Sequence, residues 1–200
     1  PDASIRIPSE PRRFADAFFA RARLRPETTL ALNPQARYET RVWPAANFAD
    51  VARAWGRRGP RRAVLIFAHG AAEARGASRI ARACESTRVV FAPTDSTVLE
   101  SAALLSRCAL LVTCDTGIMH LASAVGVRVV AVFGGTHPAG PFPFRAGNMI
   151  LHTGEFCSPC AGACPYDLRC LRRIEPAEVL RAVEAIGSRR APGRRFIFAG

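Results

Sequence analysis

A buried apolar run at residues 109–113 is followed by residues that could hold a phosphate or a sugar. Asp115, Thr116 and Gly117 come directly after it, and His120 lies one turn into a helix-like segment. At a helix N-terminus these residues combine a carboxylate, a hydroxyl, free backbone N–H groups and the positive end of the helix dipole. An Asp helix cap with a histidine packed under a loop has the same pattern. These residues alone therefore leave both interpretations open.

Such a site needs a scaffold in which several strands end at one edge. Short apolar runs alternate with longer amphipathic ones along the middle of the chain, which is typical of βαβ units. Strands that are apolar on both faces belong in a parallel sheet covered by helices, and ligands bind beyond its carboxyl ends. We therefore expect an α/β fold with a Rossmann-like, doubly wound parallel sheet. The predicted strands are Thr28–Asn33, Ala63–Ala68, Arg88–Phe91, Ala109–Thr113, Arg128–Phe133 and Asn148–His152, and the predicted helices are Ala45–Trp55, Ala71–Cys84, Ser96–Arg107, Ile118–Val125 and Pro176–Ile186.

The two ends of the chain differ from this core. Residues 1–27 include an arginine-rich amphipathic segment, Arg12–Arg23, and are expected to be a residual N-terminal segment or an interdomain linker. Residues 28–187 are expected to form the ligand-binding domain. Residues 188–200 are basic and punctuated by Gly and Pro, so we expect a loosely held basic tail.

Composition narrows the class of protein further. A chain of 200 residues with 49% hydrophobic content can bury a core. No apolar run reaches the roughly 18 residues needed to cross a bilayer, and no basic-then-apolar leader opens the sequence, so the expected location is cytoplasmic. The 28 basic residues are all arginine and give a formal charge of +12. They are scattered with few interleaved aromatic residues, so we expect no specific nucleic-acid binding; peripheral contact with the anionic inner membrane suits them better.

Several stretches resemble glycosyltransferase family 9, which contains the lipopolysaccharide heptosyltransferases. DTGIMHLASAVGVRVVAVFGGTHP resembles that family's Asp-Thr/Ser-Gly-x-x-His-Leu-Ala run, the strand after it and its Gly-Pro-Thr loop. LALNPQARYETRVWP is similar to its Asn-Pro-Gly-Ala loop and Lys-x-Trp-Pro motif. AVLIFAHGAAEARGASRIARAC and DSTVLESAALLSRCALLVTCDTG match in the same order. The resemblance extends from about Thr28 to Ile186.

The resemblance implies the C-terminal, donor-binding half of a two-domain GT-B enzyme, so residues 28–187 would bind a nucleotide sugar. Such enzymes transfer a sugar, typically from ADP-heptose, to a lipopolysaccharide acceptor without a catalytic metal. By this resemblance, Thr116 and Gly117 contact the diphosphate, Asp115 holds sugar hydroxyls and His120 lies near the sugar-phosphate. The stretch after the apolar run is thereby expected to bind the donor.

Other donor-site residues follow from the same resemblance. Arg41 takes the place of the family's phosphate-binding lysine and, with Asp115, is the expected catalytic group of this chain, because a cation stabilises the diphosphate leaving group. Glu73 matches the acid that holds the ribose. Gly135 and Thr136 belong to the Gly-Pro-Thr loop, with Gly135 in place of the proline. Gln35 stands where the family has glycine, which we expect to hinder close backbone approach there.

The acceptor side of such an enzyme is not represented in this sequence. In the family, the carboxylate that acts as general base lies in an N-terminal acceptor-binding domain. We expect this chain to need that domain, or a separately encoded half, before it can transfer a sugar. The alternative is a non-catalytic nucleotide-binding or scaffold module that keeps the fold without the acceptor domain.

A cysteine cluster lies before the last predicted helix. The stretch CSPCAGACPYDLRC places Cys157, Cys160, Cys164 and Cys170 within one short loop, which we call the Cys-rich loop. Four thiolates so close could bind a structural zinc or iron ion, although transfer itself is expected to need no cofactor. Buried reduced thiols or disulfides are the alternatives. A metal or redox protein built around this loop is a third interpretation of the whole chain.

Overall fold

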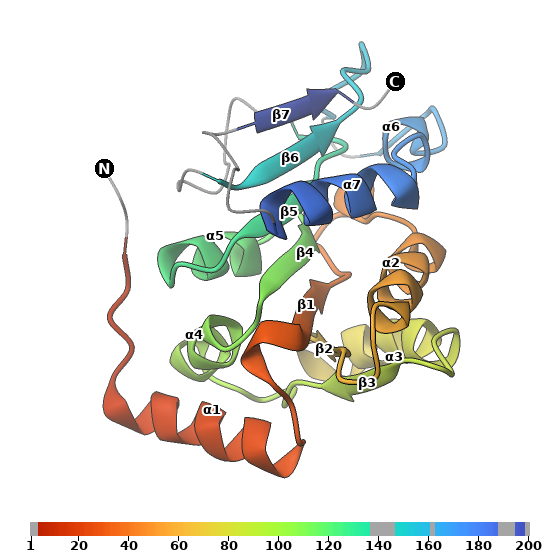
Figure 1. The fold of residues 1–200 in the computed structure, drawn as a ribbon. Helices are drawn as coiled ribbons and strands as arrows, with labels where there is room; N and C mark the ends of the chain where they lie inside the picture. Colours follow the sequence, from red (N-terminus) through yellow and green to blue (C-terminus); the bar gives the residue numbers. More distant parts are fainter. Residues whose placement is uncertain (1–3, 137–146, 161–162, 188–194, 199–200) are drawn as a thin grey trace.

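The sheet is parallel and spans the whole domain. The computed structural model describes residues 4–136, 147–160, 163–187 and 195–198, and within them it contains a seven-stranded sheet with the order β3-β2-β1-β4-β5-β6-β7 (Figure 1). Every neighbouring pair runs parallel. The strands are β1 Thr29–Asn33, β2 Ala63–Ile66, β3 Arg88–Phe91, β4 Leu110–Cys114, β5 Val129–Val132, β6 Met149–His152 and β7 Arg195–Phe198. The predicted doubly wound α/β fold is confirmed.

Helices cover both faces of this sheet. In Figure 1, α2, α3 and α7 lie on one face, and α1, α4 and α5 lie on the other. The helices are α1 Ser9–Arg21, α2 Ala45–Arg57, α3 Gly70–Arg82, α4 Val98–Ser106, α5 Gly117–Ala124, α6 Arg169–Arg172 and α7 Pro176–Gly187, with short 3-10 turns η1 Pro26–Thr28 and η2 Glu39–Arg41. The arrangement gives two hydrophobic cores separated by the sheet.

Strand β1 shows how the sequence produces these two cores. Leu30 and Leu32 are completely buried in the core that contains Trp43 and Phe48 from the α2 side, whereas Ala31 is buried in the opposite core. Side chains along a strand alternate between faces, so a strand covered on both sides must be apolar at every position. This explains why an unbroken apolar run, rather than an alternating one, predicted the strand.

Helix α1 packs against the domain. Its side chains Phe18 and Phe19 are buried in the same core as Leu104 and Leu105 of α4. Ahead of the helix, the backbone N–H of Ile5 donates a 3.0 Å hydrogen bond to a carbonyl at the end of α5. The amphipathic segment expected within residues 1–27 is thus helical and covers part of the sheet, while the boundary at residue 28 stays a prediction.

The expectation of a loosely held tail is wrong for Arg195–Phe198. These residues form β7 and pair in register with Met149–His152 at the sheet edge. The segment contains three apolar residues, but it is short and the Gly, Pro and Arg residues around it conceal its strand character in the sequence. Edge strands need only one neighbour, which is why so short a segment can complete the sheet.

Candidate donor-binding site

The candidate site lies where the strand order reverses. The chain winds outward from β1 toward β3 on one side and from β4 toward β7 on the other, so the carboxyl ends of β1 and β4 flank a topological switch point, the usual ligand position in such sheets. A cavity of about 1230 Å³ opens at this point. It is lined by Ser4, Ile5, Asn33, Gln35, Ala36, Arg37, Tyr38, Arg41, His69, Glu73, Ser96, Val98, Ser101, Asp115, Thr116, Gly117, Ile118, His120, Leu121 and Ala124.

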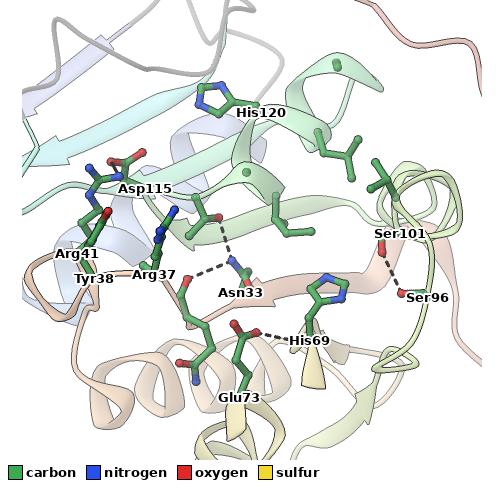
Figure 2. A pocket seen from close by; sticks show the side chains of 18 of the residues that line it. Asn33, Arg37, Tyr38, Arg41, His69, Glu73, Ser96, Ser101, Asp115 and His120 are labelled. Carbon is green, nitrogen blue, oxygen red and sulfur yellow. Dashed lines mark hydrogen bonds and ion pairs between the residues drawn. The ribbon is translucent and has the colours of Figure 1, made fainter. Parts of the chain in front are cut away.

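Side chains of different character occupy the two ends of this pocket. Figure 2 shows Arg37, Tyr38 and Arg41 near Asp115 at one end, with Ser96 and Ser101 at the other. The lining also includes apolar side chains, among them Val98, Ile118 and Leu121. The pocket therefore offers a charged region and a region with apolar surface, as an elongated ligand with a charged and a flat, less polar part requires.

Asp115 and Arg41 pair with each other. Arg41 Nη1 lies 3.2 Å from Asp115 Oδ2, and the side chains are 34% and 4% exposed, respectively. The Arg41 guanidinium also lies 5.2 Å from the centre of the Tyr38 ring, within the range of a cation–π contact. Arg41 is consequently held at the pocket by an acid and an aromatic ring, with part of its surface open to a ligand.

Asn33 connects the ends of β1 and β4. Its Nδ2 donates a 3.0 Å hydrogen bond to Thr116 Oγ1 and a 3.3 Å bond to the Gln35 carbonyl. Thr116 is the N-cap residue of α5, yet its side chain makes no capping bond to that helix. Since the Thr116 hydroxyl accepts from Asn33, its own proton can be donated to a ligand oxygen. Sequence reasoning did not assign Asn33 to the site, although it is the Asn of the stretch that resembles the Asn-Pro-Gly-Ala loop and a polar residue at the end of an apolar strand.

Gly117 begins α5 with open space beside it. A Cβ built on this residue would have no atom within 4 Å. The first N–H groups of the helix are therefore approachable from the pocket, and they carry the positive end of the helix dipole. Thr116 and Gly117 thus present a hydroxyl and backbone donors to the same volume, which is the geometry that an anion site requires.

His120 lines the pocket one turn further along α5. Burial lowers its pKa from the ordinary value of 6.5, and the nearby Asp115 carboxylate acts in the opposite direction. Burial therefore favours the neutral form of the ring. A neutral imidazole can donate from one nitrogen and accept at the other, so His120 is suited to hydrogen-bond a sugar hydroxyl or a phosphate oxygen.

Glu73 and Gln35 form part of the wall beneath Asn33. Glu73 Oε2 accepts a 2.8 Å hydrogen bond from the backbone N–H of His69, which closes the first turn of α3. The Gln35 amide reaches α3 at Gly76, where a Cβ would lie 2.7 Å from Gln35 Nε2. The hindrance to close backbone approach expected of Gln35 stays a prediction. Both side chains line the cavity.

Gly135 and Thr136 lie beside the pocket wall rather than among the lining residues. The N–H of Gly135 donates a 2.8 Å hydrogen bond to the Thr40 carbonyl, and a Cβ on Gly135 would meet Thr40 atoms at 2.9–3.1 Å. Thr40 precedes Arg41, so the close packing at Gly135 supports the segment that carries this arginine. Thr136 Oγ1 is buried without a hydrogen-bond partner among the described residues. Their contact with a donor stays a prediction.

The thiols of Cys157, Cys160 and Cys164 lie near one another in the Cys-rich loop. The Cys160 thiol donates to the Cys157 carbonyl at 3.6 Å, and burial, together with the neighbouring Cys157 and Cys164 thiols, raises its pKa. Burial also raises the pKa of Cys170 to about 11. Among the described residues, no group of three or more His, Cys, Asp or Glu side chains is placed to hold a metal ion. Four thiol ligands would suit zinc or iron, but their arrangement in this structure does not form such a site. The metal stays a prediction.

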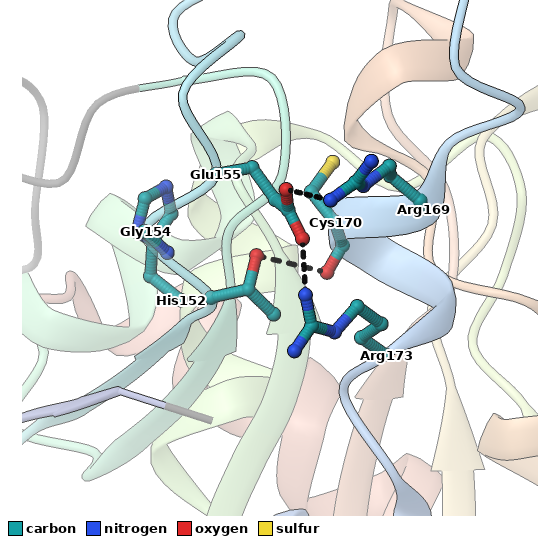
Figure 3. A network of polar contacts seen from close by, with 7 residues as sticks. His152, Gly154, Glu155, Arg169, Cys170 and Arg173 are labelled. Atoms are coloured by element: carbon teal, nitrogen blue, oxygen red, sulfur yellow. Dashed lines mark hydrogen bonds and ion pairs between the residues drawn. The ribbon is translucent and has the colours of Figure 1, made fainter. Parts of the chain in front are cut away.

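A buried carboxylate anchors the start of this loop. Glu155 is 4% exposed and pairs with Arg169 at 2.9 Å and with Arg173 at 2.8 Å (Figure 3). Burial acts to raise the Glu155 pKa, but the two guanidinium partners outweigh it, so the pKa is lowered. In addition, the N–H of Cys160 donates to the Gly135 carbonyl at 2.8 Å. The Cys160–Gly135 bond connects the Cys-rich loop to the segment that carries Arg41, because Gly135 in turn bonds the Thr40 carbonyl.

Comparison with known proteins shows the family of this chain. The family model for glycosyltransferase family 9 (heptosyltransferase) matches residues 2–167. The chain belongs to glycosyltransferase family 9. Its curated relatives include lipooligosaccharide heptosyltransferase 2 of Campylobacter jejuni, 29% identical over 157 residues (76% of this chain and 48% of that protein), and lipopolysaccharide heptosyltransferase 1 of Pseudomonas aeruginosa, 31% identical over 165 residues (74% and 44%).

Solved structures of this family share the fold. A glycosyltransferase family 9 protein from Veillonella parvula is 25% identical with a TM-score of 0.78, and E. coli ADP-heptose lipopolysaccharide heptosyltransferase II is 19% identical with a TM-score of 0.71. Each match covers 92% of this chain and 53% of the other. The chain therefore spans about half the length of the curated and solved family 9 proteins it matches.

Proposed function

We propose that this chain is the donor-binding half of a heptosyltransferase-type glycosyltransferase. The observation that carries the proposal is the convergence of Arg41, Asp115, Thr116 and Gly117 on the switch-point pocket. A nucleoside diphosphate sugar, such as the ADP-heptose named for solved family members, has the matching chemistry: an anionic diphosphate, a hydroxyl-rich sugar and a flat base.

Each residue has a chemical role in this proposal. The backbone N–H groups at Gly117 and the Thr116 hydroxyl bind diphosphate oxygens. Arg41 neutralises the charge that develops on the diphosphate as the bond to the sugar breaks, and its guanidinium fork can contact two oxygens at once. Asp115 accepts hydrogen bonds from sugar hydroxyls while orienting Arg41. The acceptor, a lipopolysaccharide-type glycan, and the base that deprotonates it are expected from an acceptor-binding domain.

Binding and transfer can be tested separately. Calorimetry should show ADP and ADP-heptose binding to the chain, with Asp115→Ala and Arg41→Ala each weaker. Adding an acceptor-binding half from a relative should then restore heptose transfer. Donor binding without transfer under any such pairing would favour the alternative of a nucleotide-binding module, and the absence of binding to any nucleoside diphosphate would contradict the proposal.

We also infer a membrane-facing edge on the side opposite the pocket. Exposed arginines Arg25, Arg61 and Arg88 precede or begin strands, and Arg57 ends α2, so the parallel topology collects them at the amino edge of the sheet. Such a surface attracts anionic lipid head groups. Among the described residues, no helix is both long and apolar enough to cross a bilayer, so the proposed contact is peripheral.

Vesicle co-sedimentation tests this edge. The chain should bind vesicles containing phosphatidylglycerol and release them at high salt, with neutral phosphatidylcholine vesicles as the comparison. The triple variant Arg25→Ser, Arg57→Ser, Arg61→Ser should lose binding. The control variant Arg75→Ser, Arg79→Ser, Arg181→Ser removes the same charge from exposed positions elsewhere. Equal loss in both variants would contradict a specific edge.

A further inference from the structure

Gln35 and Gly76 fit together across the wall of the pocket. Gln35 follows β1, and Gly76 lies in the middle of α3. A Cβ on Gly76 would lie 2.7 Å from Gln35 Nε2, closer than real Cβ contacts come. The Gln35 amide therefore rests on helix backbone that any larger residue at position 76 would cover, and the missing side chain of one residue admits the long side chain of the other.

The Gln35 amide is available to a ligand. The side chain is partly exposed and lines the pocket. Within the described part of the chain its amide makes no hydrogen bond, and only the Gln35 backbone carbonyl is used, as the acceptor of the Asn33 side chain. A ligand can bond this amide in exchange for water, without breaking a hydrogen bond within the protein.

Glu73 is a second polar residue in this wall of the pocket. Glu73 and Gly76 are three residues apart in α3, which puts them one above the other on the same helix face. Glu73 also lines the pocket, and only its Oε2 is engaged, by the His69 N–H. A carboxylate accepts hydrogen bonds, whereas an amide both donates and accepts. Neighbouring hydroxyls on one ring are the ligand chemistry that uses both groups together.

We propose that Gln35 is a specificity-determining residue of the donor site, whose amide hydrogen-bonds the ribose hydroxyls beside Glu73. The site thereby selects ribonucleoside diphosphates over their deoxy counterparts. Gly76 makes this possible by leaving the helix surface bare. The inference rests on the proposed donor-binding function, and it adds a recognition group at a position where relatives are expected to have glycine.

Calorimetry with ADP, 2′-deoxy-ADP and 3′-deoxy-ADP tests this role. The wild-type chain should prefer ADP over at least one deoxy form by about five- to tenfold, the scale of one hydrogen bond. Gln35→Ala should weaken ADP binding by a similar factor and remove that preference. Asn47→Ala, which removes a partly exposed amide outside the pocket lining, should change neither. If Gln35→Ala weakens all three ligands equally, or none of them, the role is overturned.

A substitution at Gly76 provides a second, independent test of the role of Gln35. Gly76→Ala should displace the flexible Gln35 side chain without loss of thermal stability, and should reduce ADP affinity and the preference for ribose. In the Gln35→Ala background, the same substitution should have no further effect. An equal loss in both backgrounds would show that position 76 does not act through Gln35.

The two proposals fail differently. If Asp115→Ala weakens ADP binding while the Gln35 and Gly76 variants discriminate ribose as the wild type does, the ribose role is overturned and donor binding stands. If the wild-type chain binds no nucleoside diphosphate, both proposals are overturned.

Discussion

Arg41 Nη1 lies 3.2 Å from Asp115 Oδ2, joining the loop after β1 to the end of β4 at the switch point of the sheet. Asp115 is almost completely buried, and the Arg41 guanidinium lies against its carboxylate. A diphosphate bound beside Asp115 would be repelled by the carboxylate if Arg41 were absent. We therefore expect substitutions of the two residues to have coupled effects on donor binding.

We expect Asp115→Ala and Arg41→Ala each to weaken ADP-heptose binding by about 1–3 kcal/mol, the scale of a charge-assisted hydrogen bond. Arg41→Ala should cost more, because it leaves the buried carboxylate facing the phosphates. The double variant should lose less than the sum of the single losses, since the residues interact directly. Calorimetry on the four proteins measures this coupling, and strictly additive losses would contradict it.

We expect the Asn33 side chain to affect donor affinity by holding the Thr116 hydroxyl in place. Asn33→Ala removes the 3.0 Å bond that fixes the Thr116 hydroxyl, so we expect donor affinity to fall by about 1 kcal/mol. Asn148→Ala is the matched control. Asn148 is equally buried and donates to Ser123 Oγ, away from the pocket. It should lower thermal stability and leave donor affinity unchanged; equal effects of both variants on affinity would argue against a positioning role.

Glu155 should stabilise the protein in a pH-dependent way. Its pKa is lowered by Arg169 and Arg173 against the effect of burial, so its contribution is present above the ordinary carboxyl pKa of 4.5 and is lost as pH falls below it. Glu155→Gln should therefore lower the melting temperature at pH 7, and the difference from wild type should shrink below about pH 4.5.

Thermal denaturation between pH 7 and pH 3 measures this difference. Glu184→Gln is the control, because that carboxylate is 62% exposed and pairs only at the surface with Arg58. A Glu155→Gln difference that is the same at both ends of the pH range would contradict the role of the ionised carboxylate.

The Cys-rich loop carries a separate prediction. If the four thiols hold a structural zinc or iron ion, elemental analysis of the purified protein should find one equivalent, and Cys157→Ser should lower it. Cys108→Ser, at a buried thiol outside the loop, should leave the metal content unchanged. Absence of metal from the wild type, or the same content in Cys157→Ser, would contradict the prediction.

Much of this fold could be predicted because its strands are unbroken apolar runs. The run before Asp115 and the run at Ala63–Ala68 correspond to β4 and β2 within about two residues. Strand β7 could not be predicted in this way, because Arg195–Phe198 is too short to stand out among Gly, Pro and Arg residues. Its pairing depends on an edge that β6 provides only in the folded sheet.

The sequence could predict which residues belong to the candidate site better than it could predict the contacts between them. Asp115, Thr116 and Gly117 could be selected from their place after a strand, and the resemblance added Arg41. Contacts that depend on the strand order could not be read from the sequence. The Arg41–Asp115 pair requires β1 beside β4, and the Gln35 orientation depends on the glycine at position 76 in another element.

The central claim is that the switch-point pocket binds a nucleoside diphosphate sugar. The most direct measurement is the change in backbone amide NMR shifts of ¹⁵N-labelled protein on adding ADP or ADP-heptose. The account predicts the largest changes at Thr116, Gly117 and the Arg41 segment, with these changes reduced in Asp115→Ala. Saturating ligand that leaves those amides unmoved, or shifts only residues away from the pocket, would contradict it.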